Sequence, residues 1–146
     1  MLGAVDGARV LDLFAGSGAL GIEALSRGAA AAVFVERDAR ALAVIGENLA
    51  ALGLGSQVAE IRRADALCAV REARERGEKY DLLLIDPPYE KAPQLTEALS
   101  VSVPALLAPG ARVVVESDRR SQLRLELPLA RERRYGDTSI TIHRQP

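Results

Sequence analysis

The hydrophobic pattern of the chain alternates between short apolar runs and longer segments whose apolar residues recur at helical spacing. The short runs predict strands, and the periodic segments predict helices. Gly28 and Gly53 are typical helix ends, and Asp38 and Asp65 are typical N-terminal caps. The pattern predicts strands over 9–14, 31–36, 57–63, 80–86 and 111–117, and helices over 18–27, 41–53, 66–77 and 93–107.

This alternation, at a period of roughly 25 residues, indicates a parallel sheet with right-handed crossovers and helices on both faces. Residues 129–144 differ, because two strand-like stretches around Gly136–Asp137 predict an antiparallel hairpin. A mostly parallel sheet that ends in such a hairpin departs from the flavodoxin-like and dinucleotide-binding strand orders. It resembles the Rossmann-like α/β fold of class I S-adenosylmethionine-dependent methyltransferases.

The length of 146 residues suits one domain, over 1–146. Hydrophobic residues make up 49% of the chain and charged residues 27%, which excludes disordered and fibrous classes. The single cysteine, Cys68, cannot form an intramolecular disulfide or a cysteine-based zinc site, and no other metal site is indicated. Without a signal-peptide pattern or a long apolar run, we expect a cytoplasmic monomer that does not enter a membrane.

The net charge is −1, but positive charge gathers near the carboxyl terminus. Residues 119–134 contain six arginines and two glutamates. Such a cluster is either a solvated surface or a contact for the phosphates of a nucleic acid, and the sequence leaves both open.

A glycine pattern follows the first predicted strand. Gly16, Gly18 and Gly21 form G-x-G-x-x-G at the start of the first predicted helix. The first two glycines permit a tight turn and close approach of a ligand, and Gly21 lets the helix pack near the sheet. The context favours a nucleotide-like ligand over a purely structural turn.

Acidic residues lie within or at the ends of the first four predicted strands. Glu36 is spaced to accept hydrogen bonds from ribose hydroxyls, which NAD and S-adenosylmethionine both carry. With Asp12, Asp65 and Asp86, it places four carboxylates around one crevice. They favour a ligand with ammonium and sulfonium groups over a pyrophosphate, because like charges repel. Purely structural roles remain as alternatives for two of them: Asp65 as only a helix cap, and Asp12 as only an anchor of the loop.

The most specific motif is Asp86-Pro87-Pro88-Tyr89, at the end of the central strand. Prolines lack N–H donors and fix the backbone, so the carbonyls of this segment need donors from elsewhere. If Asp86 and the Pro87 carbonyl accept both hydrogens of an aromatic amine, its nitrogen is aimed at an electrophile and its developing charge is stabilised. Tyr89 offers a face on which a flipped base stacks. These four residues are the predicted catalytic segment, with a merely rigid loop as the alternative.

The segments LDLFAGSGALGIEALSRGAA, FVERD, LLLIDPPY and RRYGDTSITI resemble the RsmD-type family of bacterial methyltransferases over nearly the whole chain. The resemblance implies direct methyl transfer from S-adenosylmethionine to the 2-amino group of a guanine in 16S ribosomal RNA, free or in a partly assembled small subunit. No metal or covalent intermediate is implied. Asp86, Pro87 and Tyr89 would hold the guanine amine. The implied cofactor contacts are Ala15, Gly16, Ser17, Gly18, Glu36, Asp65 and Ala66.

Family members usually begin with a further basic segment before the first strand, whereas this chain begins about eight residues before it. We expect this difference to affect RNA binding more than the cofactor pocket.

Other functions stay open from the residues alone. The glycine loop also suits an NAD-dependent oxidoreductase. A methyltransferase could instead act on a DNA adenine or a protein glutamine, because both present the same amine chemistry. A non-enzymatic binding module would hold the cofactor without engaging RNA. Ser17 is not expected to be a nucleophile, because AGSGA lacks the G-x-S-x-G elbow. We expect Cys68 to be an inert core residue and His143 to have a structural or surface role.

Overall fold

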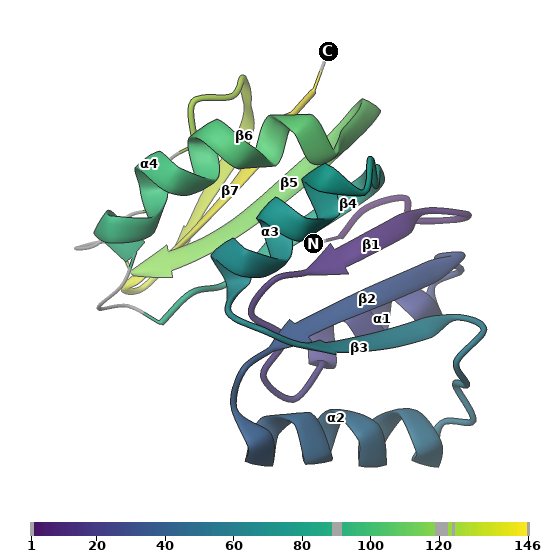
Figure 1. Ribbon diagram of the computed structural model, residues 1–146. Coiled ribbons are helices and arrows are strands. Elements are labelled where there is room, and N and C mark those ends of the chain that lie inside the picture. The colour runs from purple at the N-terminus through teal and green to yellow at the C-terminus, as the bar shows by residue number, and fades with distance from the viewer. Residues whose placement is uncertain (1, 89–91, 119–122, 124, 146) are drawn as a thin grey trace.

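The computed structural model describes residues 2–88, 92–118, 123 and 125–145 (Figure 1). The helices are α1 (Ala19–Ser26), α2 (Ala39–Ala51), α3 (Ala66–Glu75), α4 (Ala92–Ser102) and the 3-10 helix η2 (Val103–Leu106). The strands are β1 (Arg9–Asp12), β2 (Ala31–Glu36), β3 (Ala59–Arg63), β4 (Tyr80–Ile85), β5 (Leu107–Asp118), β6 (Leu129–Tyr135) and β7 (Thr138–Arg144).

The strands form a seven-stranded sheet in the order β3-β2-β1-β4-β5-β7-β6. Strands β1 to β5 are parallel, while β7 is antiparallel to both β5 and β6. The hairpin turns at Gly136, whose φ of 58° suits the left-handed region that glycine adopts. This architecture confirms the predicted fold class.

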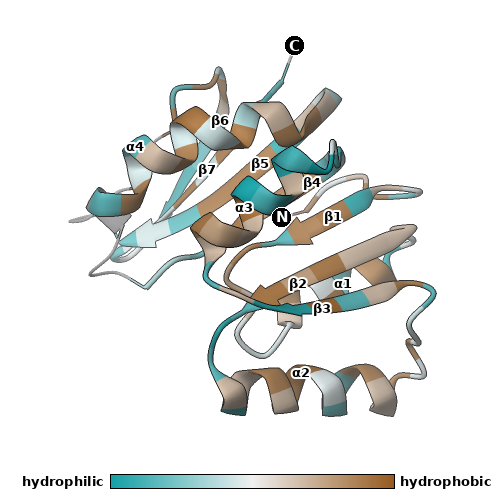
Figure 2. Cartoon of the chain, viewed as in Figure 1, coloured by the Kyte–Doolittle hydropathy of each residue, from teal (hydrophilic) through white to brown (hydrophobic). Residues whose placement is uncertain are grey.

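Two hydrophobic core clusters lie on opposite faces of the sheet. One packs β-strand residues such as Leu83 and Val113 against α3, α4 and η2. The other packs residues such as Phe34 and Leu84 against α1 and α2. In Figure 1, α3 and α4 lie on one side of the sheet and α1 on the other. The strands between them are largely hydrophobic (Figure 2), as expected for strands covered on both faces.

Element boundaries differ from prediction mainly before β5. The predicted helix over 93–107 ends as an α-helix at Ser102, continues as η2, and gives way to β5 at Leu107 rather than at 111. Pro104 lies at the start of η2 and lacks the N–H that an α-helix needs there. The predicted caps are confirmed, because Asp38 accepts a hydrogen bond from the Ala41 N–H and Asp65 from the Leu67 N–H.

The expectation that Cys68 is a core residue is wrong. The buried residues of α3 are Ala66, Ala69, Val70 and Ala73, which recur at helical spacing, and Cys68 lies off that face and is exposed. His143 is buried in β7, where its ring nitrogens lie 3.1 Å from the Leu127 carbonyl oxygen and 3.2 Å from the Thr141 hydroxyl. These contacts support a structural role for His143.

Candidate active site

The carboxyl ends of the parallel strands surround a cavity of about 450 Å³. This is where open α/β sheets bind ligands, and the volume lies within the range of about 300–1,000 Å³ of ligand pockets. The lining residues are Leu13, Phe14, Gly16, Val35, Glu36, Arg37, Ala64, Asp65, Ala66, Asp86, Pro87, Pro88, Leu95 and Glu116.

The glycine loop connects β1 to α1 at the rim of this cavity. Gly16 has a φ of 57°, and nothing lies within 4 Å of the position that a Cβ atom would take. Glycine is therefore required there by backbone conformation, and the space beside it is open to a ligand. Gly21 serves packing instead, because a Cβ atom there would clash with Cε1 of Phe34. This confirms the predicted role of Gly21 in bringing α1 close to the sheet.

Glu36 holds the glycine loop in place. One carboxylate oxygen accepts a hydrogen bond of 2.9 Å from the Gly16 N–H. The other accepts bonds of 2.8 Å from the N–H groups of Arg37 and Asp38. A carboxylate has about four acceptor positions, so one is left for a ligand hydroxyl. The sequence predicted Glu36 only as a ligand contact and missed this bracing, which depends on the path of the loop.

The structure brings most of the predicted site residues together, though not all of them. Gly16, Glu36, Asp65, Ala66, Asp86, Pro87 and Pro88 line the cavity. Ala15, Ser17 and Gly18 belong to the glycine loop but not to the lining, and Tyr89 falls outside the described residues. Asp65 both caps α3 and lines the cavity, so its capping role leaves the predicted contact with a ligand possible in the same position.

Asp12 lies beneath the loop and is only 3% exposed. Burial raises the pKa of its carboxyl to about 7, against the lowering effect of hydrogen bonds from the backbone N–H groups of Gly21 and Phe14. The negative charges of Asp86 and Glu36 raise this pKa further. Asp12 therefore anchors the loop and responds to the charge in the cavity above it.

Asp86 follows β4 directly and faces the cavity beside Glu116 of β5. Partial burial, and secondarily the charge of Glu116, raises the pKa of Asp86 to about 6. Glu116 was missed at the sequence level. The strand order contained the signal, because β5 pairs with β4 and Ile85 lies opposite Val115, so an acid after Val115 falls beside Asp86.

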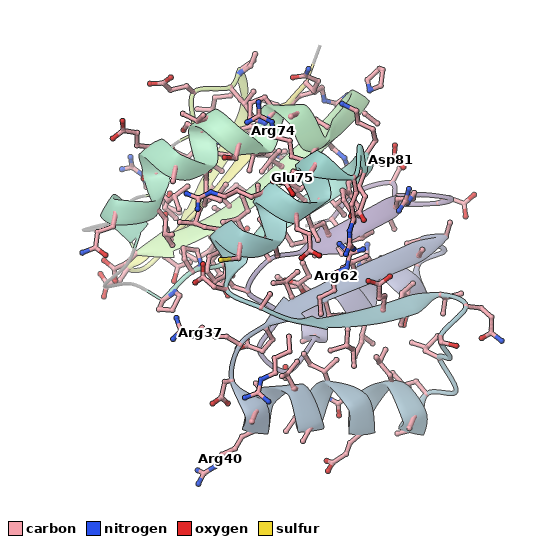
Figure 3. All side chains as sticks on the ribbon, in the orientation of Figure 1. Arg37, Arg40, Arg62, Arg74, Glu75 and Asp81 are labelled. Carbon is pink, nitrogen blue, oxygen red and sulfur yellow. The ribbon has the colours of Figure 1, made fainter. Side chains whose placement is uncertain are left out.

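The charge of the lining is strongly negative. Among the described lining residues, four carboxylates, Glu36, Asp65, Asp86 and Glu116, face one cation, Arg37, which Figure 3 shows near the carboxyl ends of β2 and β3. An Arg37 guanidinium nitrogen lies 3.7 Å from an Asp65 carboxylate oxygen, and both side chains are largely exposed. The lining therefore suits a cationic ligand better than a pyrophosphate.

Within residues 2–88, 92–118, 123 and 125–145, no three His, Cys, Asp or Glu side chains are grouped as ligands of a metal ion. In the same part of the chain, no helix has the length and apolar character needed to cross a membrane.

A family described as "Conserved hypothetical protein 95" matches residues 1–144. The chain belongs to this family. With the relatives below, membership confirms the resemblance to RsmD-type proteins. The putative rRNA methyltransferase YlbH of Bacillus subtilis is 36% identical over 143 residues, which is 96% of this chain and 77% of that protein.

Ribosomal RNA small subunit methyltransferase D of Escherichia coli (strain K12) is 36% identical over 112 residues. The match covers 76% of this chain and 54% of that protein, so the chain spans about half the length of this relative. A solved structure, the putative methyltransferase yhhF from Escherichia coli, superposes with a TM-score of 0.80 at 30% identity. It covers 97% of this chain and 77% of the yhhF chain.

Proposed function

We propose that the chain transfers a methyl group from S-adenosylmethionine to the exocyclic 2-amino group of a guanine in small-subunit ribosomal RNA. The observation that carries the proposal is the acceptor corner formed by Asp86 and Pro87, which lines the same acidic cavity as Gly16 and Glu36. The names of the family relatives support an rRNA methyltransferase rather than an NAD-dependent oxidoreductase.

The charge of the cavity and the open space beside Gly16 both support the proposed cofactor. The excess of carboxylates in the cavity suits a ligand with ammonium and sulfonium groups, and the open space beside Gly16 admits a ligand close to the backbone. Gly16, Glu36, Asp65 and Ala66 would hold the cofactor, which supplies an electrophilic methyl group when bound. We also propose Ala15, Ser17 and Gly18 as cofactor contacts, because they belong to the same glycine loop.

Asp86 and Pro87 would orient the acceptor nitrogen. Pro88 restricts the backbone of Pro87 to extended conformations, so the Pro87 carbonyl is held in one direction. With a pKa of about 6, Asp86 is mainly ionised at neutral pH and accepts hydrogen bonds only. Together the two groups would accept both amine hydrogens and stabilise the charge that develops on nitrogen. Tyr89 remains the proposed stacking surface.

Glu116 supports guanine as the acceptor. Guanine presents its N1–H beside the 2-amino group, so a second carboxylate next to Asp86 offers an acceptor for that neighbouring donor. Adenine has an unprotonated N1 beside its amine, which the Glu116 carboxylate would repel.

The test is methyl transfer from labelled S-adenosylmethionine to undermodified 16S ribosomal RNA and small subunits, followed by mass mapping of the modified nucleotide. We expect N2-methylguanine. Parallel reactions with DNA and protein extracts cover the other amine acceptors. Methylation of another base, or of DNA or protein alone, would overturn the proposal.

A pair of variants tests the role of Asp86. Asp86→Ala should slow transfer about 100-fold or more, because it removes an electrostatic contact of the reaction centre. Calorimetric binding of S-adenosylhomocysteine should be largely preserved. Asp81 lies at the opposite end of β4 (Figure 3), where it accepts a hydrogen bond from the Arg9 N–H. Asp81→Ala is the matched control and should leave transfer nearly unchanged.

A further inference from the structure

The β6–β7 hairpin has two different faces. Side chains alternate along a strand, so Arg131, Arg133 and Tyr135 of β6 point to one face while Glu132 and Arg134 point to the other. Arg134 forms an ion pair of 3.2 Å with Glu132. The arginine-rich segment is therefore partly neutralised on one face and cationic on the other.

The cationic face is hollowed. A depression of about 200 Å³ is lined by Gly3, Arg131, Arg133, Tyr135, Ile140 and Ile142, with no acidic residue among them. Arg131 and Arg133 form no ion pair within the described part of the chain, and an Arg133 nitrogen lies 3.5 Å from the Tyr135 hydroxyl. Tyr135 is 56% exposed. Two guanidinium groups and an exposed ring over an aliphatic floor suit a nucleotide, with phosphate on the arginines and a base on the ring.

This depression lies on the same face of the sheet as an active-site residue. Glu116, which lines the acidic cavity, pairs with Ile140, and Ile140 pairs with Arg133. Residues directly opposite each other in antiparallel strands point to the same face. Two strand spacings separate Glu116 from Arg133, which is about 10 Å between backbones. A strand that places one base in the acidic cavity can therefore continue over β7 onto β6.

We propose that the Arg131–Arg133–Tyr135 face binds single-stranded RNA next to the target guanine, an inference that rests on the proposed function. In this arrangement the acidic cavity binds the cofactor and the target base. The basic hairpin face binds a neighbouring nucleotide and its phosphate. A second copy of the chain is a poorer occupant, because antiparallel pairing of two β6 edges would bring arginines of both copies together.

The test is fluorescence anisotropy of a short fluorescein-labelled single-stranded RNA with the 146-residue chain, without cofactor and over a range of salt concentrations. Arg131→Ala and Arg133→Ala should each weaken binding several-fold and reduce the magnitude of the salt slope by about 0.7 per lost phosphate contact. Tyr135→Ala should weaken RNA binding about ten-fold, through lost stacking, without changing the salt slope. Arg134→Ala is the matched control, with the same charge change on the opposite face, and should have little effect.

Equal losses in Arg134→Ala and Arg133→Ala would overturn the proposal, because they would indicate unspecific attraction. So would unchanged binding in all four variants, or a dimer in sedimentation experiments that Arg131→Ala dissociates. Thermal melting confirms that each variant is folded. Failure of the proposed function is separate: it would appear as absent methyl transfer while RNA binding still depended on Arg131 and Arg133.

Discussion

If Asp86 and the Pro87 carbonyl each accept one hydrogen of the amine, as proposed, Asp86 acts as a pure acceptor only when it is ionised, and its surroundings raise its pKa to about 6. Below that pH the carboxyl acquires a proton, becomes a donor and loses acceptor capacity. We therefore expect the single-turnover transfer rate to fall about ten-fold per pH unit below pH 6. Asp86→Asn should have a low rate without this titration. If the transfer rate of Asp86→Asn still falls below pH 6, the titration belongs to another group.

Glu116 influences the same titration from the neighbouring strand. Its negative charge contributes to the raised pKa of Asp86, so Glu116→Gln should move the acidic limb of the rate profile to lower pH. At neutral pH the variant should also be slower with guanine, because an amide NH2 can face the guanine N1–H. The pH profile of single-turnover transfer measures both effects. If Glu116→Gln has the same pH profile and the same rate as the wild type, Glu116 has no role in the transfer reaction.

At the scale of elements, the contact between α1 and β2 depends on Gly21. An added methyl group would meet the Phe34 ring, so Gly21→Ala should destabilise the fold by about 1–3 kcal/mol. Gly46 in α2 is the matched control, because nothing lies within 4 Å of its Cβ position. Gly46→Ala should stabilise the protein by about 0.5–1 kcal/mol. Urea denaturation measures both, and equal effects would contradict the packing argument.

Elements with a regular pattern could be predicted from sequence, and those governed by tertiary contacts could not. The strand 31–36 and the hairpin turn at Gly136 follow from hydrophobic runs and turn residues. The early start of β5 at Leu107 escaped prediction, because Pro109 and Gly110 disfavour a strand and Leu107 pairs with Tyr80 only across an irregularity in the register that contains them. Glu116 joined the site only through the strand order, which no single segment contains.

At the scale of the whole molecule, the sheet separates charge along its width. The acidic cavity lies at the carboxyl ends of β1 to β5, and the cationic face lies on the last strand, β6. The formal net charge of −1 conceals this separation. A cationic cofactor and a polyanionic RNA can therefore be attracted to adjoining regions of one surface, where each charge pattern would repel the other ligand.

The acidic cavity also makes the stability of the whole molecule depend on pH through Asp12. Its folded-state pKa of about 7 exceeds the ordinary value of 3.8, so the folded protein binds more protons than the unfolded chain between these pH values. The stability that protonated Asp12 contributes is therefore lost as pH rises through this window, and the free energy of unfolding falls by about 4 kcal/mol in total. Asp12→Asn keeps an acceptor oxygen for the N–H groups of Gly21 and Phe14 but carries no charge.

We therefore expect Asp12→Asn to be more stable than the wild type near pH 7.5, with an advantage that shrinks by more than half near pH 5. Urea denaturation of both proteins at both pH values gives this difference. S-adenosylmethionine should lower the pKa of Asp12 by placing positive charge above it, so binding near pH 6.5 should release protons in calorimetry. Asp12→Asn should release fewer. A stability difference that does not change with pH would show that Asp12 is charged in the fold at every pH tested.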